Sequence, residues 1–356
     1  MKAVLTGFEC FLLLATALPF VRRPYWWIRI FDFPRFQLAF LLLLTIVLHL
    51  SFFYPHSSGG FVLIGLLSVA LLVQMYFIYQ FTPFVAKRAL AATKTDKQNR
   101  IRMMMANVKM DNTNYRRLLD IARDTNPDLF LLCEPNRQWC EGTRELAEAF
   151  PHSVLQPLEN TYGMMLYSKL PLEDTEVRFQ VMDGIPSIFT TVVLRSGQRI
   201  RLYCLHPQPP QFNSNTEDRE AELLMTARIV QKSGEPSIVA GDLNDVGWSY
   251  TTKLFQRISG LLDPRIGRGF FNTYSVFVPF FRYPLDHVFY SEHFKLVDLK
   301  KLPRFGSDHF PVCIELQYEP DAAHQQEVPQ ADAADQAEAQ EMIEEGLEKA
   351  GEKTVG

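Results

Sequence analysis

The stretch PSIVAGDLNDVGW, residues 236–248, joins a strand of buried type to a polar ending. Small and β-branched apolar residues run directly into Gly241 and Asp242, and Asn244 follows two positions later. Alternation along an extended chain would place Asp242 and Asn244 on the same side. Gly-Asp and Asn-Asp pairs also form ordinary tight turns. Alone, the stretch fits a hairpin turn as well as a catalytic loop.

Three nearly uncharged apolar segments precede this motif, at residues 3–21, 36–54 and 61–81. Each has about the length that crosses a bilayer as a helix. Trp26, Trp27, Tyr54 and Tyr79 lie near their ends, as is typical of membrane interfaces. The sequence therefore predicts a membrane domain at residues 1–85 with three transmembrane helices. The first segment would also serve as an uncleaved signal anchor.

Basic residues predict the orientation of these helices. Arg22, Arg23, Arg29 and Arg35 lie between the first two segments, a basic linker at residues 86–100 follows the third, and PHSSGG between the second and third has no Lys or Arg. Lys and Arg are retained in cytoplasmic loops. We therefore expect an external N-terminus and a cytoplasmic domain after residue 100.

Residues 101–318 alternate between strand-like and helix-like segments. RIRMMMANVKM and PDLFLLCEP are typical of strands, whereas NYRRLLDIARDT has helical spacing and TEDREAELLMTARIVQKSG is a long helix closed by Gly234. This mixed order predicts a layered α/β or α+β sandwich. Cys133, Cys204 and Cys313 lie in apolar runs, as small core residues do, with no metal or disulfide spacing.

Charge is distributed unevenly along the chain. Residues 100–318 carry 25 Lys and Arg against 26 Asp and Glu, so this domain lacks the overall basic charge of many nucleic-acid-binding proteins. Residues 319–356 carry 11 acidic against 2 basic residues and are rich in Ala and Gln. We expect them to form an acidic disordered tail, or a loose solvated helix, without chemistry of its own.

Polar residues interrupt the apolar runs of the central domain at or just past their ends. A lone Asn or Asp after a strand is usually a turn residue, and a lone His is usually structural. As a set, however, they are all Asn, Asp, Glu or His, which indicates one pocket for a hard cation such as Mg²⁺ or Mn²⁺. The histidine spacing does not suit zinc. The set is Asn107, Glu134, His206, Asp242, Asn244, Asp286, Asp308 and His309.

Read in order, these motifs resemble the endonuclease/exonuclease/phosphatase superfamily, which is deoxyribonuclease I-like. The resemblance covers about residues 101–316 and rests on ANVKMDN, PDLFLLCEP, YGMMLYSKLPL, LHPQPP, VAGDLND, PLDHVFYS and GSDHFPV. With three preceding spans and the HPQPP form, the chain looks most like bacterial membrane-anchored members of the YafD-like type. The resemblance implies an α+β fold, a four-layered α/β/β/α sandwich at residues 101–318, in the bacterial inner membrane.

The resemblance also implies hydrolysis of a phosphoester by in-line attack of water, assisted by a divalent ion, Mg²⁺ or Mn²⁺. Glu134, with Asn107 nearby, would hold the metal, and Asp308 would complete its coordination. The ion would polarise the phosphoryl oxygens and stabilise the departing oxygen.

Five further residues would act on water and phosphate in this scheme. Asp242 would position or deprotonate the water, Asn244 would hold a non-bridging oxygen, and His206 would donate to the charge that develops on the phosphate. His309, oriented by Asp286, would contact the phosphate or serve as the base. Which of Asp242 and His309 takes the proton stays open. This resemblance favours the catalytic interpretation of residues 242–244 over the turn.

Three positions depart from the patterns of the resembling proteins. Cys133 stands where many members have Gln before the metal-binding Glu, and Tyr274 where membrane-anchored members often have Trp. Lys109 stands where abasic-site nucleases have Asp, which argues against an abasic-site repair enzyme.

The predicted function is a membrane-anchored, divalent-metal-dependent phosphoesterase that hydrolyses a phosphodiester, with a nuclease as the first interpretation. A nuclease needs a basic groove, which Arg265, Arg268 and Arg282, together with Arg116 and Arg117, would supply. The Phe-rich stretch at residues 269–284 predicts core packing, or a surface that stacks on a base or contacts lipid. A phospholipid or sphingomyelin-type phosphodiesterase and an inositol-phosphate phosphatase are alternatives. A catalytically inactive membrane scaffold is a third, which the complete residue set disfavours.

Overall fold

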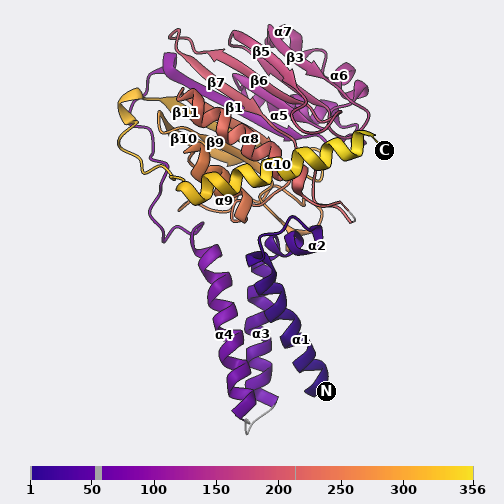
Figure 1. Cartoon of the computed structure of the whole chain (residues 1–356). Coiled ribbons are helices and arrows are strands. Elements are labelled where there is room, and N and C mark those ends of the chain that lie inside the picture. Colours follow the sequence, from indigo (N-terminus) through magenta and orange to yellow (C-terminus); the bar gives the residue numbers. More distant parts are fainter. Residues whose placement is uncertain (1, 53–57, 213, 356) are drawn as a thin grey trace.

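The computed structural model describes residues 2–52, 58–212 and 214–355. Figure 1 shows a helical stalk and, above it, a layered domain of strands and helices. Within these ranges three helices are long and apolar enough to cross a membrane, at Ala3–Phe20, Arg35–Phe52 and Ser58–Tyr79. They are α1 (Lys2–Ala17) with a 3₁₀ extension, α3 (Arg35–Phe52) and α4 (Ser58–Tyr79). Residues 53–57, which include the end of the second predicted segment, lie outside the described residues.

The stalk helices expose apolar side chains on their outer surfaces. Leu42 is fully buried between the helices, but Leu72 on α4 is 68% exposed, and only 22 to 39% of each span is buried. Glu9 is the single carboxylate of the three spans, and its Oε1 lies 2.7 Å from His49 Nδ1 inside the bundle. Helices that face lipid show this pattern of apolar surface and internally paired polar groups.

The segment between α1 and α3 docks onto the upper domain, and it contains α2 (Trp26–Arg29). Arg29 Nε lies 2.9 Å from Glu220 Oε1 on helix α8 (Glu217–Ser233), and both side chains are 3% exposed. Trp248 Nε1 donates to Asp32 O at 2.7 Å. Arg29, which we expected to be a free positive charge of the loop, is therefore part of a buried ion pair, and orientation has to be argued from the remaining basic residues.

The described strands of the upper domain form two mixed sheets. The first has the order β10-β11-β1-β2-β4-β3, with β1 and β2 parallel. The second has the order β5-β6-β7-β8-β9, with β7 and β8 parallel. The strands are β1 (Arg100–Asn107), β2 (Leu129–Cys133), β3 (His152–Gln156), β4 (Met164–Ser168), β5 (Leu172–Arg178), β6 (Ser187–Val193), β7 (Arg199–Cys204), β8 (Ser237–Asp242), β9 (Asp286–Tyr290), β10 (Phe294–Lys301) and β11 (Val312–Tyr318).

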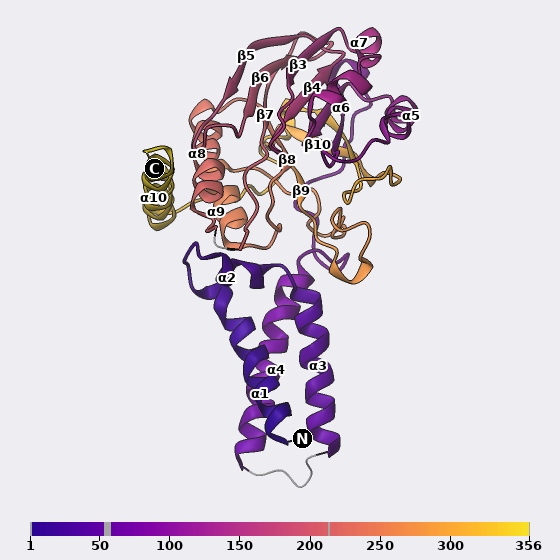
Figure 2. The same ribbon diagram turned by 90° about the vertical axis from the view of Figure 1, so that its right-hand side faces the viewer.

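The two sheets pack face to face, and helices cover both outer faces (Figure 2). The period of two along β1 shows how: Met103 and Met105 belong to the core between the sheets, whereas Met104 and Ala106 pack under helices. The outer helices are α5 (Tyr115–Thr125), α6 (Arg137–Gly142) and α7 (Leu146–Ala149) on the first sheet, and α8 and α9 (Tyr250–Ser259) on the second. This is the expected α+β fold, a four-layered α/β/β/α sandwich.

Residues 319–356 were expected to be a disordered acidic tail or a loose solvated helix, but most of this segment is a helix packed on the domain. Residues 333–355 form helix α10 (Ala333–Val355), which lies along α8 on the outside of the domain (Figure 2). Ala339, Ile343 and Ala350 are buried along one face, and Gly346 lies on the same stripe. These four residues follow one another at intervals of four, three and four, the spacing of a helix with one packing face. The pattern was not recognised in a sequence rich in Ala, Gln and Glu.

Ion pairs and close packing hold α10 in place. Arg257 makes two hydrogen bonds to Asp335, at 2.7 and 2.8 Å, so part of the acidic charge is paired with the domain. A Cβ atom on Gly346 would lie 2.4 Å from Ala221 Cβ and 2.7 Å from Glu217 O. The glycine therefore allows α10 to approach α8 closely.

We predict that Gly346→Leu will separate α10 from α8, because the new side chain has no room against Ala221. Limited proteolysis of the full chain in detergent should cleave the C-terminal segment faster in this variant than in the unaltered protein. Gly351→Leu is the matched control: it changes another glycine of the same helix, and its Cβ would meet no atom within 4 Å. Equal cleavage rates in the two variants would contradict the packing described here.

Candidate active site

The candidate residues lie where strands of both sheets meet at one rim. Asn107 is the last residue of β1, and its partner on the parallel strand β2 is Cys133, so Glu134 follows one step beyond. In the second sheet Asp242 ends β8 and faces Asp286, the first residue of the antiparallel β9. Because parallel strands end at the same edge, polar side chains from both sheets collect there.

Asn107 joins the two sheets. Its Nδ2 donates to Glu134 Oε1 at 2.7 Å and to Asp242 Oδ2 at 2.9 Å, so each hydrogen of the amide has a carboxylate partner. Its Oδ1 accepts from the backbone N–H of Lys109 at 3.0 Å. Asn107 is 1% exposed and Asp242 is fully buried. This amide therefore holds the partly exposed carboxylate of Glu134 beside the buried carboxylate of Asp242 through two charge-assisted hydrogen bonds.

Backbone conformation aims Glu134 into the site. The residue has φ 65°, in the left-handed region, and its N–H donates to Gly163 O at 2.9 Å. A Cβ on Gly163 would lie 1.9 Å from Pro135 O, so only glycine fits opposite this turn. A non-glycine residue holds such a conformation only where its surroundings enforce it, which is common at functional sites.

The donor set fits a hard divalent cation. The Glu134 side chain is 22% exposed, so its carboxylate can be reached from solvent. Burial raises the pKa of Glu134, although His206 and the Asn107 hydrogen bond oppose this. A charged carboxylate that is costly to bury gains from a bound cation, and oxygen donors suit Mg²⁺ or Mn²⁺. Asp308 is half-buried nearby, with its Oδ1 3.4 Å from Ser307 Oγ, and its charge adds to the raised pKa of His309.

His309 lies between two carboxylates. Its Nδ1 is 2.8 Å from Asp286 Oδ2 and its Nε2 is 3.5 Å from Asp242 Oδ2. Burial by itself lowers the pKa of His309, but Asp286 and Asp242 outweigh it and raise the pKa to about 10. These three side chains have ligand atoms within 4.8 Å of one another, a spacing that a metal ion also tolerates. A protonated His309 would also supply positive charge between the two carboxylates.

His206 closes the opposite side of the site. Its Nδ1 lies 3.0 Å from Asp242 O, an acceptor only, so Nδ1 carries the hydrogen. Its Nε2 lies 3.7 Å from Glu134 Oε1, and Tyr162 packs against the ring at a centroid distance of 5.8 Å. The histidine is 2% exposed, and its ring is held with Nε2 toward the site.

Asn244 shows that residues 242–244 form both a turn and a part of the site. β8 ends at Asp242, and Asn244 has φ 50°, so the chain is not extended between these two residues. The strand alternation used to place Asp242 and Asn244 on the same side is therefore wrong. Instead the Asn244 N–H donates to Asp242 Oδ1 at 3.0 Å, and its Nδ2 donates to Pro207 O at 2.9 Å. Arg219 Nη1 holds the Asn244 carbonyl at 2.6 Å.

Six of the eight predicted side chains are linked by these contacts, Asn244 joins them through its backbone N–H, and Asp308 is adjacent. Sequence reasoning missed the surrounding groups that hold them. Ser307 Oγ donates to Asn107 O at 2.8 Å, and Thr273 Oγ1 accepts from the Asp286 N–H at 3.3 Å. Tyr274 lies 5.0 Å from the His309 ring, between centroids. Their position within or next to the quoted motifs was the one available signal for these groups.

The loop arginines Arg265, Arg268 and Arg282 supply little of the expected basic groove, whereas Arg116 and Arg117 are exposed on α5. Arg265 is 4% exposed and pairs with Asp263 at 2.8 Å, and Arg268 donates to backbone carbonyls of Pro264 and Ala89. Arg282 alone of the three lies in the loop beside residues 308–310, where Val276 N–H donates to Asp308 O at 2.8 Å. Two of the three arginines therefore have structural roles.

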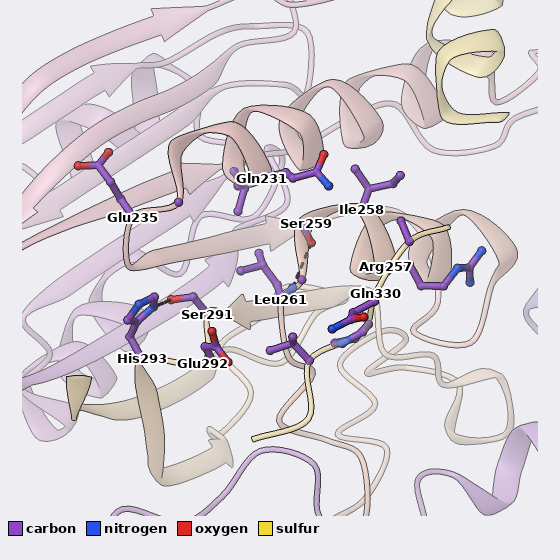
Figure 3. A pocket seen from close by; sticks show the side chains of 16 residues that line it. Gln231, Glu235, Arg257, Ile258, Ser259, Leu261, Ser291, Glu292, His293 and Gln330 are labelled. Carbon is purple, nitrogen blue, oxygen red and sulfur yellow. Dashed lines mark hydrogen bonds between the residues drawn. The ribbon is translucent and has the colours of Figure 1, made fainter. Parts of the chain in front are cut away.

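A cavity of about 390 Å³ lies at the opposite end of the second sheet (Figure 3). Its lining includes Glu235, which precedes β8, and Ser291 and His293, which follow β9. His293 Nδ1 lies 3.1 Å from Ser291 Oγ. Because Asp242 and Asp286 are at the other ends of these two strands, this cavity does not belong to the candidate active site.

The family model described as "Endonuclease/Exonuclease/phosphatase family" matches residues 106–309. This match spans more than half of the chain and includes every candidate residue. The protein belongs to this family, and it is therefore a hydrolase of phosphoester bonds, in a family whose members depend on a divalent metal ion. None of the curated proteins compared with the chain matches it.

Solved structures share the fold at low sequence identity. The human Nocturnin catalytic domain with bound sulfate is 17% identical, with TM-score 0.50, over 63% of this chain and 96% of that chain. D. rerio TDP2 in complex with a single-strand DNA product is 17% identical, with TM-score 0.51, over 61% and 99%. A conserved protein of unknown function from Enterococcus faecalis V583 is 14% identical, with TM-score 0.50, over 62% and 100%.

The Asn107 bridge can be tested by Asn107→Asp, which would bring a third carboxylate to Glu134 and Asp242. Two favourable hydrogen bonds become repulsions, a loss of about 2 kcal/mol or more. At pH 7 with a chelator, the unfolding temperature should fall by roughly 4 °C or more. Mg²⁺ should recover part of this loss, because it neutralises the added charge.

Circular dichroism of the full chain in detergent would follow this unfolding. The control is Gln330→Glu, which makes the same change from amide to carboxylate at an exposed position lining the cavity at the opposite end of the second sheet. If Asn107→Asp unfolded at the control's temperature, the bridging role of Asn107 would be refuted.

Proposed function

We propose that the protein is a membrane-anchored, divalent-metal-dependent phosphodiesterase. The observation that carries this proposal is the contact of Asn107 with both Glu134 and Asp242. It places the carboxylate proposed to bind the metal, from one sheet, beside the carboxylate proposed as the general base, from the other. The stalk supports the membrane part, since its three candidate spans expose apolar surface on all sides.

In this proposal Glu134, Asn107 and Asp308 hold Mg²⁺ or Mn²⁺. When bound, the ion would polarise the phosphoryl oxygens and offset charge on the leaving oxygen. Glu134 supplies the negative charge, and the hydrogen bond from Asn107 Nδ2 holds its carboxylate in position. Asp308 adds a second carboxylate from the segment just before His309.

We assign the base to Asp242 rather than to His309. Asp242 Oδ2 is held by Asn107, and its Oδ1 accepts from the Asn244 N–H, so the carboxylate is fixed at the mouth of β8. Both nitrogens of His309 face carboxylates, which suits a donor to phosphate oxygen better than a proton acceptor. Asp286 positions His309, and Asn244 lies next to a non-bridging oxygen. His206 donates a hydrogen bond from Nε2 to the charge that develops on the phosphate when both of its ring nitrogens are protonated.

The substrate in this proposal is a phosphodiester, either in nucleic acid or in a lipid or other small molecule. The weak basic groove gives limited support to nucleic acid. A specific observation favours the lipid-type alternative: Phe277, Phe280 and Phe281 are 60, 55 and 49% exposed on the loop beside Asp308. Exposed aromatic side chains next to membrane helices suit contact with a bilayer. An inositol-phosphate phosphatase is the remaining hydrolytic alternative.

We further propose that the protein resides in a bacterial inner membrane with the catalytic domain in the cytoplasm. The stalk supports one part of this, because α1, α3 and α4 place the α1–α3 segment and the domain at the same end (Figure 1). Lys87 and Arg88 follow α4 at that end, as the retention of basic residues in the cytoplasm requires.

Asp242→Ala should lower metal-dependent hydrolysis of bis-p-nitrophenyl phosphate by the full chain in detergent at least about hundredfold, because the general base is lost. Chelation with EDTA should abolish the activity, and Mg²⁺ should restore it. Asp120→Ala, on the exposed face of α5, is the control that should keep full activity. If the unaltered protein showed no metal-dependent turnover, the inactive-scaffold interpretation would replace this proposal.

A substrate panel separates the remaining alternatives. We expect the unaltered protein to hydrolyse at least one of plasmid DNA, phosphatidylglycerol, sphingomyelin and inositol phosphates, with Asp242→Ala inactive on the same compound. Cleavage of DNA would support the nuclease, and turnover confined to lipids would support the phospholipid-type enzyme. Inorganic phosphate released from inositol phosphates alone would overturn the phosphodiesterase assignment in favour of a phosphatase.

A further inference from the structure

An open cavity of about 850 Å³ lies where the stalk meets the catalytic domain. One wall is the first turns of α3, with Phe36 and Phe40, and the other is the loop before β9, with Phe270 and Phe280. The rings of Phe36 and Phe270 are in contact, with centroids 4.5 Å apart, and Gln37 Nε2 donates to Phe280 O. Figure 2 shows this loop, in orange, beside the upper end of α3.

The position of the cavity along α3 fits the boundary between head groups and hydrocarbon. Phe36 lies in the first turn of a helix that is apolar from there to Phe52, so its domain end marks where the bilayer surface is expected. Phe40 and Phe280 are 56 and 55% exposed on the two walls. An aromatic groove of this kind in water would be unfavourable, whereas beside a bilayer it is a place for an acyl chain.

The rim of the cavity on the domain side is positively charged. Arg282 and Lys301 line it and lie on the same ring, Phe310, at 5.2 and 4.4 Å from its centroid. Lys301 Nζ donates to Asn272 O at 3.1 Å, and Arg282 donates to the backbone carbonyls of Ser275 and Val276. Among the described residues neither cation has an ion pair with a carboxylate.

Two neighbouring cations without an acidic partner favour a bound anion. Burial lowers the pKa of Lys301, and the positive charge of Arg282 lowers it further. The two cations therefore repel each other unless an anion lies between them. The third basic residue of the lining, Lys300, is already paired with Asp298 at 3.4 Å on the exposed outside. The anion is thus expected between Arg282 and Lys301.

We propose that the cavity binds one anionic glycerophospholipid of the surrounding bilayer, with its phosphate on Arg282 and Lys301 and an acyl chain along Phe40. The apolar wall favours a lipid over a free anion, and the charged rim favours an anionic over a zwitterionic head group. The bound lipid would bridge α3 and the loop that packs against Asp308 and His309. This site is separate from the catalytic one and does not depend on the substrate.

Native mass spectrometry of the full chain in detergent, titrated with dioleoyl phosphatidylglycerol or dioleoyl phosphatidylcholine, tests the proposal. We expect preferential retention of one phosphatidylglycerol. The double variant Arg282→Gln/Lys301→Gln should weaken its binding about thirtyfold, to the level of phosphatidylcholine. The control Lys232→Gln, on an exposed position at the end of α8, should bind as the unaltered protein does. Equal affinity for the two lipids in the unaltered protein would overturn the proposal.

A second pair of variants tests the apolar wall of the cavity on α3 and leaves the loop before β9 unchanged. Phe40→Ala should weaken the binding of phosphatidylglycerol, whereas Phe52→Ala, at the other end of the same helix and 66% exposed, should not. Glycerol 1-phosphate at millimolar concentration should fail to displace the lipid. Displacement by it would show a free-anion site, and equal effects of the two Phe variants would show a nonspecific lipid annulus; either result contradicts the proposal.

The catalytic site provides the last discriminator. Asp242→Ala should retain phosphatidylglycerol fully, because the cavity does not include Asp242. Loss of lipid in this variant would place the lipid in the catalytic site and overturn the inference. This experiment measures lipid binding and not catalysis. A protein that is inactive on every phosphodiester would contradict the proposed function but would not change the lipid-binding result, so the two proposals can fail independently.

Discussion

The site depends on one amide that serves two sheets. Asn107 ends a strand of the first sheet, and its two N–H groups reach Glu134 beside it and Asp242 at the end of a strand in the second sheet. The negative charges of Glu134 and Asp242 repel each other, which contributes to the raised pKa of Glu134. The amide and the imidazole of His309 compensate them, so the rim at which the sheets meet holds concentrated negative charge ready for a metal ion and a phosphate.

A second buried network ties this rim to the stalk. Arg29, just before α3, pairs with Glu220, and the neighbouring Arg219 lies 3.8 Å from Asp245 and holds the carbonyl of Asn244. Charges buried to this degree keep their geometry only while every partner is present. The segment between α1 and α3 is therefore part of the packing that fixes residues 242–245.

The sequence predicted local features well and distant contacts poorly. Strand ends at Asn107, Glu134 and Asp242 could be read from apolar runs that stop at polar residues, because burial and termination are local properties. The packing of helix α10 on the domain was missed, since its packing face consists largely of Ala and Gly, and these small side chains contribute little until α8 lies opposite. Arg265 was assigned to a groove because its contact with His287, 22 residues further along the chain, appears only in the folded structure, where Arg265 Nη2 lies 2.7 Å from His287 Nδ1.

By itself the sequence determined the family, three candidate membrane helices and the set of polar residues, since the length of apolar runs and the order of chemically distinct motifs are written directly in the chain. Tertiary structure alone decided which carboxylates share Asn107, that residues 333–355 cover α8, and that a charged aromatic cavity opens beside α3. The physical reason is that these features arise between elements far apart in the chain, and their energies depend on which faces the packing brings together.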